Sequence, residues 1–309
     1  MTTTPHAPEP TSGAPPPDTD AEPTSGVLRP DTDLTLPAGE STVVTTDDGA
    51  RLAVTIAGGA TATAPTVVLP HCWTGSRAMG VPVARRLVAA GHRVVLYDQR
   101  GHGESTLGRE PISIGRLGDD LGAVLAELEV AGAVLAGHSM GGMTVMGHAC
   151  RHPGQVRARA RGLVLVATAA HGLAHRQPVL SLAMRGIPVE RLMARPRLGH
   201  ALVRGTFGLD PQPDHVEATR AHFAGTRPEV WRACLAAMRD MDLRYSLRAV
   251  DLPAVVVLGR RDRLVPNSLT RAIAEHLAGA EVVELPGAGH MLPLERPDEV
   301  AEVIRRVAS

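Results

Sequence analysis

Aromatic residues are scarce in this sequence, with two Trp, two Tyr and two Phe among 309 residues. Proteins that bind nucleic-acid bases commonly stack them on such rings, so we do not expect nucleic-acid binding. There is no surplus of charge either, because Lys and Arg together number 32 and Asp and Glu together number 32. No overall field therefore attracts polyanions or anionic membranes. The core has to be built from aliphatic residues.

Cysteines and long apolar runs are also few. Three scattered cysteines, Cys72, Cys150 and Cys234, predict neither a disulfide framework nor a paired-cysteine metal site. No apolar run approaches the roughly 20 residues that span a bilayer, and the N-terminus lacks the pattern of a secretory signal. No phosphate loop or dinucleotide fingerprint is found. We therefore expect a cytoplasmic protein with no integral membrane segment, metal or cofactor.

The first 40 residues are rich in Pro, Thr, Asp and Ala and contain few large apolar side chains. Such a segment cannot bury enough surface to offset the entropy of ordering, so residues 1–40 are predicted to be a disordered tail. Their removal is expected to leave stability and turnover unchanged.

After the tail, two alternating segments flank Asp48-Gly49 and predict a β-hairpin. Short apolar runs then alternate with helix-length amphipathic stretches, which predicts an α/β fold with a doubly wound, mostly parallel sheet. The runs expected to be strands are 66–70, 94–97, 133–137, 162–167, 254–259 and 281–285; the expected helices are 81–90, 114–129, 140–152, 269–277 and 297–307.

The alternation is interrupted between residues 171 and 250, where the pattern is helical and no strand is evident. This stretch is too long for an ordinary loop. We expect a helical insertion that folds over the strand ends as a cap. The α/β core would then comprise residues 41–170 and 251–309.

Gly137-His138-Ser139-Met140-Gly141 lies between a predicted strand and a predicted helix. A turn this sharp needs small residues on both sides of the serine. It holds the serine hydroxyl at the N-terminus of the following helix, where the helix dipole favours developing negative charge. His138 is interpreted as a packing residue behind the turn. Ser139 is the candidate nucleophile.

Asp262 and His290 each lie in a loop just after a predicted strand. Open α/β sheets place their ligand crevice at these carboxyl ends of the strands. The chain order Ser, Asp, His is the order in which this kind of sheet supplies a nucleophile, a carboxylate that orients the base, and the base itself. Ser139, Asp262 and His290 are therefore predicted to form a catalytic triad.

Together these segments resemble the α/β-hydrolase superfamily over roughly residues 42–308. A further match is Tyr97–Ser105, which is similar to the family's Asp-x-Arg-Gly-x-Gly-x-Ser turn; there Asp98 and Arg100 have a structural role beside the nucleophile. One residue departs from the pattern, because Cys72 follows His71 where the family usually has glycine. This thiol is expected to narrow the loop or to lie near the acyl pocket.

The resemblance implies that His290 removes the proton of Ser139 as the hydroxyl attacks a carbonyl, while Asp262 orients the imidazole. It also implies an oxyanion hole made by the backbone N–H groups of Trp73 and Met140. Trp73 and Cys72 are the residues expected to contact substrate.

We therefore expect a serine hydrolase that cleaves a small or medium apolar carboxylic ester, similar to a carboxylesterase or monoacylglycerol lipase. Carbon–carbon bond hydrolases, thioesterases, lactonases and cofactor-free perhydrolases use the same triad and stay open. Epoxide hydrolases and haloalkane dehalogenases are excluded, since they need Asp in place of Ser139. A ligand-binding receptor with little turnover is the alternative outside enzymes.

Overall fold

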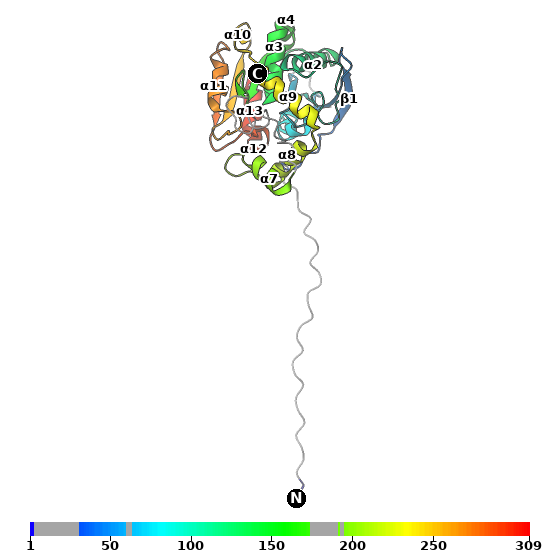
Figure 1. Ribbon diagram of the computed structural model, residues 1–309, viewed down its shortest axis with the longest axis vertical. Coiled ribbons are helices and arrows are strands. Elements are labelled where there is room, and N and C mark those ends of the chain that lie inside the picture. The colour runs from blue at the N-terminus through cyan, green and yellow to red at the C-terminus, as the bar shows by residue number, and fades with distance from the viewer. Residues whose placement is uncertain (3–30, 60–63, 174–190, 192–194) are drawn as a thin grey trace.

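The computed structural model describes residues 1–2, 31–59, 64–173, 191 and 195–309 (Figure 1). Its centre is an eight-stranded sheet in the order β1-β2-β4-β3-β5-β6-β7-β8. The strands from β4 to β8 in this order run parallel, whereas β1 and β2 pair antiparallel with their neighbours. Their bounds are β1 Gly39–Thr45, β2 Arg51–Ala57, β3 Val67–Pro70, β4 Val94–Tyr97, β5 Ala133–His138, β6 Ala160–Val166, β7 Ala254–Gly259 and β8 Glu281–Leu285. The predicted mostly parallel sheet is confirmed.

Strands β1 and β2 form the expected hairpin. Val44 pairs with Leu52, and Thr45 pairs with Arg51. Gly49 has φ 88°, the left-handed conformation that the turn requires and that glycine adopts without strain. The hairpin lies at one end of the sheet, opposite α11 in Figure 1.

Each central strand contributes side chains to two separate cores, because successive residues of a strand face opposite sides of the sheet. In β4, Val94 and Leu96 pack toward α1 (Val81–Ala89) and α13 (Pro297–Ala308). Val95 and Tyr97 pack toward α2 (Ile114–Glu127) and α3 (Met140–Arg151). Since both faces are covered, these strands are apolar throughout rather than alternating.

The helices begin where the local sequence satisfies or removes free N–H groups. The hydroxyl of Ser113 accepts the N–H of Arg116 at the start of α2 (3.0 Å). Several other helices begin at proline, which has no N–H to lose and whose φ suits the first turn. These are α4 (Pro153–Arg159), α7 (Pro196–Arg204), α8 (Pro213–Gly225), α9 (Pro228–Asp240) and α13; the shorter elements are η1 (Arg77–Gly80), α10 (Arg244–Leu247), α11 (Asn267–Ala274) and α12 (Leu292–Glu295).

Helices α7 to α10 lie between β6 and β7, where the helical insertion is expected. The described part of this segment contains no strand, only an isolated bridge between His171 and Asp242. Trp231 and Met238 of α9 are buried in the same apolar cluster as the sheet residues. Residues 174–190 and 192–194 of the expected cap lie outside the described residues. The division into core and cap stays a prediction.

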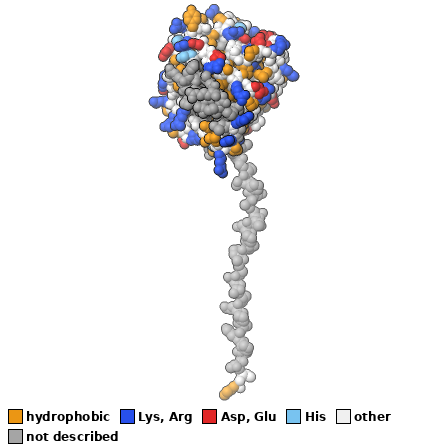
Figure 2. Space-filling view, viewed as in Figure 1, with side chains coloured by type: hydrophobic (Ala, Val, Ile, Leu, Met, Phe, Trp, Pro, Cys, Tyr) orange, Lys and Arg blue, Asp and Glu red, His pale blue; other side chains and the backbone are white. Residues whose placement is uncertain are grey.

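Positive and negative side chains are interspersed on the face of the domain seen in Figure 2, as the equal numbers of the two charges lead one to expect. A helix long and apolar enough to cross a bilayer is not found in the described part of the chain.

Residues 31–38, which belong to the expected tail, lie against the domain. Leu34 and Leu36 are partly buried, each against one of the two apolar cores. Two ion pairs add to this contact, Asp31 with Arg86 (2.9 Å) and Asp33 with Arg85 (2.7 Å). The part of the chain that packs on the domain therefore begins before residue 40, the expected end of the tail. Composition averaged over the first 40 residues does not reveal this, because it gives little weight to two leucines. Residues 3–30 of the expected tail lie outside the described residues.

The expectation that removal of the tail leaves stability unchanged is revised by these contacts. Removal of residues 1–38 is expected to lower the free energy of unfolding by roughly 2 kcal/mol, because it uncovers two leucines and breaks two partly exposed ion pairs. Urea denaturation measures the change. A variant that begins at Asp31 keeps these contacts and is the matched control. Equal unfolding free energies for the two truncations would show that residues 31–38 do not stabilise the domain.

His148 of α3 lies fully buried against α2. The two helices approach closely there, since a Cβ on Gly118 would lie 2.5 Å from the backbone nitrogen of His148. Burial, together with the nearby ring of His152, lowers the pKa of His148 to about 4. The folded protein therefore holds this ring neutral at pH values where the unfolded chain binds a proton.

The free energy of unfolding is consequently expected to be highest above pH 6.5 and to fall as the pH drops toward 4, with His148 contributing up to about 3 kcal/mol. His148→Gln is expected to make the fall shallower without abolishing it, because other buried histidines remain. Guanidinium unfolding at several pH values tests this. The exposed His200→Gln variant is the control, and an unchanged slope in His148→Gln would contradict the assignment.

Candidate active site

Ser139 occupies a strained turn between β5 and α3. Its backbone has φ 54° and ψ −116°, a conformation that costs a residue with a side chain about 1–3 kcal/mol. Two contacts with the end of β6 hold it there. The N–H of Ser139 donates to the carbonyl of Val166 (2.8 Å), and the hydroxyl of Thr168 donates to the carbonyl of Ser139 (2.7 Å).

The glycines on either side of Ser139 are required by space. A Cβ on Gly137 would lie 2.2 Å from the carbonyl oxygen of Gly141, and one on Gly141 would lie 2.0 Å from the carbonyl oxygen of Pro70. In both cases the obstacle is backbone, which cannot move aside as a flexible side chain can. The requirement for small residues around the serine, expected from the sequence, has this physical cause.

Ser139, His290 and Asp262 lie together. The hydroxyl oxygen of Ser139 is 3.0 Å from Nε2 of His290, and Nδ1 of His290 is 2.8 Å from Oδ2 of Asp262. The other carboxylate oxygen accepts the backbone N–H groups of Leu264 and Val265, each at 2.8 Å. Because the carboxylate can only accept, Nδ1 carries the hydrogen and Nε2 presents a lone pair to the serine hydroxyl.

The backbone of His290 is fixed by contacts that the sequence did not reveal. Its N–H donates to the carbonyl of Thr206, which follows α7 (2.8 Å). Its carbonyl accepts Nε2–H of His138 (2.8 Å). Burial lowers the pKa of His138 to about 3, so this ring is neutral. His138, expected only as a packing residue, therefore also connects the turn at Ser139 with the loop of His290.

Glu295 was likewise missed by sequence reasoning. Its carboxylate accepts the backbone N–H groups of Gly289 (3.0 Å) and Met291 (3.0 Å), on the two sides of His290. It also accepts the N–H of Gly208, in the segment after α7 (2.7 Å). The sole signal in the sequence is a carboxylate about one helical turn after His290. Glu295 thus joins the insertion to the loop that carries the histidine.

The loop after β3 is held beside α3 by paired hydrogen bonds. Nε2 of His71 accepts the N–H of Gln99 (2.9 Å), and the side chain of Gln99 donates to the carbonyl of His71 (2.6 Å). The hydroxyl of Thr144 in α3 donates to Oε1 of Gln99 (2.5 Å). Burial lowers the pKa of His71, so its ring stays neutral and able to accept. These bonds fix the positions of Cys72 and Trp73.

Asp98 and Arg100 make ion pairs, which fits the structural role that the resemblance implies for them. Asp98 accepts both the backbone N–H and the guanidinium of Arg77 (2.7 and 2.6 Å). Arg100 is fully buried and forms two-point contacts with Asp48 and Asp120. Removing one partner of such a buried pair typically costs about 3–5 kcal/mol.

A small apolar cavity of about 20 Å³ lies beside Ser139 and His290. Cys72 and Trp73 line it, as expected of residues that would contact substrate. Burial raises the pKa of the Cys72 thiol to about 12, so the thiol is neutral and a poor nucleophile. The other lining residues are Leu173, Thr206, Phe223, Met238, Leu264, Val265 and Met291.

Candidate metal ligands are not clustered in the described ranges, where no three His, Cys, Asp or Glu side chains come together. The contacts between histidines and carboxylates are pairs, such as His290 with Asp262 and His152 with Asp119 (2.6 Å).

A model described as "Alpha/beta hydrolase family" matches residues 54–303. The chain belongs to this family. It is 28% identical over 256 residues to the pimeloyl-(acyl-carrier protein) methyl ester esterase of Xanthomonas oryzae pv. oryzae, covering 78% of this chain and 94% of that protein. It is 27% identical over 216 residues to 3-oxoadipate enol-lactonase 2 of Acinetobacter baylyi, covering 69% and 78%.

Solved structures of hydrolases superpose on this hydrolase over most of its length. The enol-lactonase from Burkholderia xenovorans LB400 aligns with a TM-score of 0.71 at 28% identity, covering 86% of this chain and 99% of the other. The thermophilic esterase from Thermogutta terrifontis aligns with a TM-score of 0.71 at 25% identity, covering 88% and 100%. The fold expected from the sequence is therefore confirmed.

Substitution of Glu295 by Ala in this hydrolase is expected to lower kcat by roughly 10–100-fold with little change in KM, because a small displacement of His290 impairs proton transfer more than substrate binding. Glu295→Gln keeps one accepting oxygen and is expected to restore part of the rate. Initial rates on an ester substrate give both constants. Exposed Glu299→Ala in α13 is the control, and an equal loss of rate in the two alanine variants would argue against a positioning role.

Proposed function

We propose that this hydrolase cleaves small or medium carboxylic esters through an acyl-enzyme formed on Ser139. The observation that carries the proposal is the chain of contacts from Ser139 through His290 to Asp262, at 3.0 and 2.8 Å. Relatives named as esterases and lactonases support ester cleavage as the reaction class.

In the first half-reaction, Nε2 of His290 takes the proton of Ser139 while the serine oxygen forms a bond to the carbonyl carbon of the ester. The imidazolium that results is stabilised by Asp262. The tetrahedral intermediate then collapses, the bond to the alcohol oxygen breaks, and His290 donates its proton to that oxygen. The alcohol leaves and the acyl group stays on Ser139.

The negative oxygen of the tetrahedral intermediate would be held by the backbone N–H groups of Trp73 and Met140. Met140 is the first residue of α3, so its N–H belongs to the positive end of the helix dipole. Trp73 lies in the loop that the His71–Gln99 bonds hold beside this helix end. Two such donors are the arrangement that acyl transfer on this fold needs.

In the second half-reaction, water loses a proton to His290 and attacks the acyl carbon. The bond between that carbon and the oxygen of Ser139 then breaks, His290 returns the proton to the serine oxygen, and the acid leaves. The acyl group would lie against Leu173, Met238 and Met291, which favours a compact apolar acid. Neutral Cys72 would contact the substrate without reacting with it. A carboxylesterase or monoacylglycerol-lipase-like activity fits this lining.

Ser139→Ala is expected to lower turnover of a short chromogenic ester by at least about 10³-fold and to abolish labelling by a fluorophosphonate, because the attacking oxygen is lost. Circular dichroism checks that the variant is folded. Exposed Ser246→Ala in α10 is the matched control. Full turnover in Ser139→Ala would refute the assignment, and an unreactive wild-type protein would favour a receptor.

A further inference from the structure

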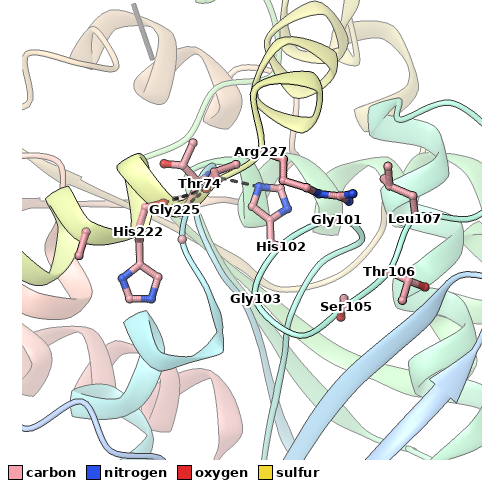
Figure 3. Close-up of a pocket in the computed structure, with 13 residues that line it drawn as sticks. Thr74, Gly101, His102, Gly103, Ser105, Thr106, Leu107, His222, Gly225 and Arg227 are labelled. Carbon is pink, nitrogen blue, oxygen red and sulfur yellow. Dashed lines mark hydrogen bonds between the residues drawn. The ribbon is translucent and has the colours of Figure 1, made fainter. Parts of the chain in front are cut away.

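A second, larger cavity of about 790 Å³ opens between the insertion and the loops that follow β3 and β4 (Figure 3). The turn between α8 and α9 forms one side, and the loop from Gly101 to Leu107 forms the other. Its lining residues are Thr74, Gly75, Gly101, His102, Gly103, Ser105, Thr106, Leu107, Ala221, His222, Gly225, Thr226 and Arg227. We refer to it as the outer cavity, and to the cavity at Ser139 as the inner cavity.

The inner cavity is too small for a whole ester. At about 20 Å³ it has room for about one water molecule. The outer cavity has the volume that sites for small organic molecules usually have. If the bond to be cleaved lies at Ser139, the outer cavity is the nearby space that can hold the larger part of a substrate.

The two cavities are lined by neighbouring residues of the same two segments, and we refer to the rings of Trp73 and Phe223 as the partition. Trp73 and Phe223 line the inner cavity, whereas Thr74 and His222, their neighbours in the chain, line the outer one. The rings of Trp73 and Phe223 meet edge to face, with centroids 5.9 Å apart. Trp231 packs against Trp73 at 4.4 Å, so three of the chain's six Phe, Trp and Tyr residues gather at this partition.

The indole N–H groups of Trp73 and Trp231 are buried, and neither has an acceptor among the residues that the structure describes. Turning the Trp73 ring aside therefore breaks only apolar contacts. A substrate oxygen beside Trp73 would give this N–H the acceptor that it lacks, which favours the open arrangement when substrate is bound.

The lining of the outer cavity favours an anionic group. Among the described residues it includes no Asp or Glu, and its histidine rings are already engaged: His102 with the N–H of Thr74 (3.3 Å) and His222 with the hydroxyl of Ser76 (2.8 Å). Arg227 is the positively charged residue of the described lining. Its half-exposed guanidinium forms an ion pair with Glu229 at 3.6 Å, and in Figure 3 it points across the cavity toward Gly101 and Leu107.

We propose that the substrate spans both cavities, with a compact apolar part beside Ser139 and a larger part, bearing a carboxylate, beside Arg227. The Trp73–Phe223 partition opens around the ester group. This inference rests on the proposed ester hydrolysis and adds the substrate class, a carboxylate-bearing ester.

Two pairs of esters, assayed with the full-length protein, test whether the substrate carries a carboxylate. They also test whether that carboxylate lies on the acyl or the alcohol side of the ester. Phenyl acetate and 4-acetoxybenzoate differ by a carboxylate on the alcohol side, and methyl hexanoate and monomethyl adipate differ by one on the acyl side. Arg227→Gln is expected to lower kcat/KM for the charged ester of one pair about fivefold, through KM, with its neutral partner unchanged. Arg239→Gln removes an exposed arginine at the far end of α9 and is the control.

A fall in kcat/KM for the charged ester of either pair supports the proposal. The pair that responds shows whether the carboxylate lies on the acyl or the alcohol side. Unchanged ratios in both pairs would mean that the outer cavity holds only solvent, and would overturn it while leaving ester hydrolysis intact. Binding of the same charged esters to Ser139→Ala, by calorimetry, separates the two failures. If binding depends on Arg227 but no ester is turned over, the anion site stands and the proposed function falls.

The opening of the partition has its own readout. Trp231→Phe leaves Trp73 as the sole tryptophan, so its fluorescence reports on that ring alone. In the Ser139→Ala background, binding of the charged ester is expected to shift or quench this emission. Binding with unchanged emission would show that the ring does not move and would overturn this part of the proposal.

Discussion

The left-handed backbone at Ser139 is the constraint on which the rest of the site depends. It places the hydroxyl at the N-terminal end of α3. It persists because β6 lies beside β5 and supplies the carbonyl of Val166, while Thr168, two residues after β6, supplies its hydroxyl. The same strand order brings the loops after β7 and β8 to this edge of the sheet. Asp262 and His290 can therefore meet the serine from segments that are distant in sequence.

Buried polar contacts hold the loops around this edge with little freedom. Arg100 forms ion pairs with Asp48 of the hairpin and with Asp120 of α2. Asp98 forms an ion pair with Arg77, the first residue of the 3-10 helix η1. The loop that carries Asp98 and Arg100 continues into one wall of the outer cavity. Loss of one of these ion pairs would therefore change the shape of the outer cavity as well as lower the stability of the fold.

The sequence predicts the elements and site residues that have a local pattern of residue types. Parallel strands buried on both faces appear as short apolar runs, and the residues proposed for catalysis lie just after such runs, so both could be located. Contacts made by backbone groups leave no such pattern, which is why Glu295 and Thr206 were missed. The aromatic partition could not be foreseen because Trp73, Phe223 and Trp231 come from separate segments. The docking of Leu34 and Leu36 was hidden by the average composition around them.

Glu295 and His290 both bind the stretch from Thr206 to Gly208, one as an acceptor and the other as a donor. If that stretch lifts from the sheet, both bonds are lost at once and the imidazole loses its support from that side. The segment after α7 therefore helps to hold the loop that carries His290. A substitution that shifts this segment is expected to reach the imidazole through two hydrogen bonds rather than one.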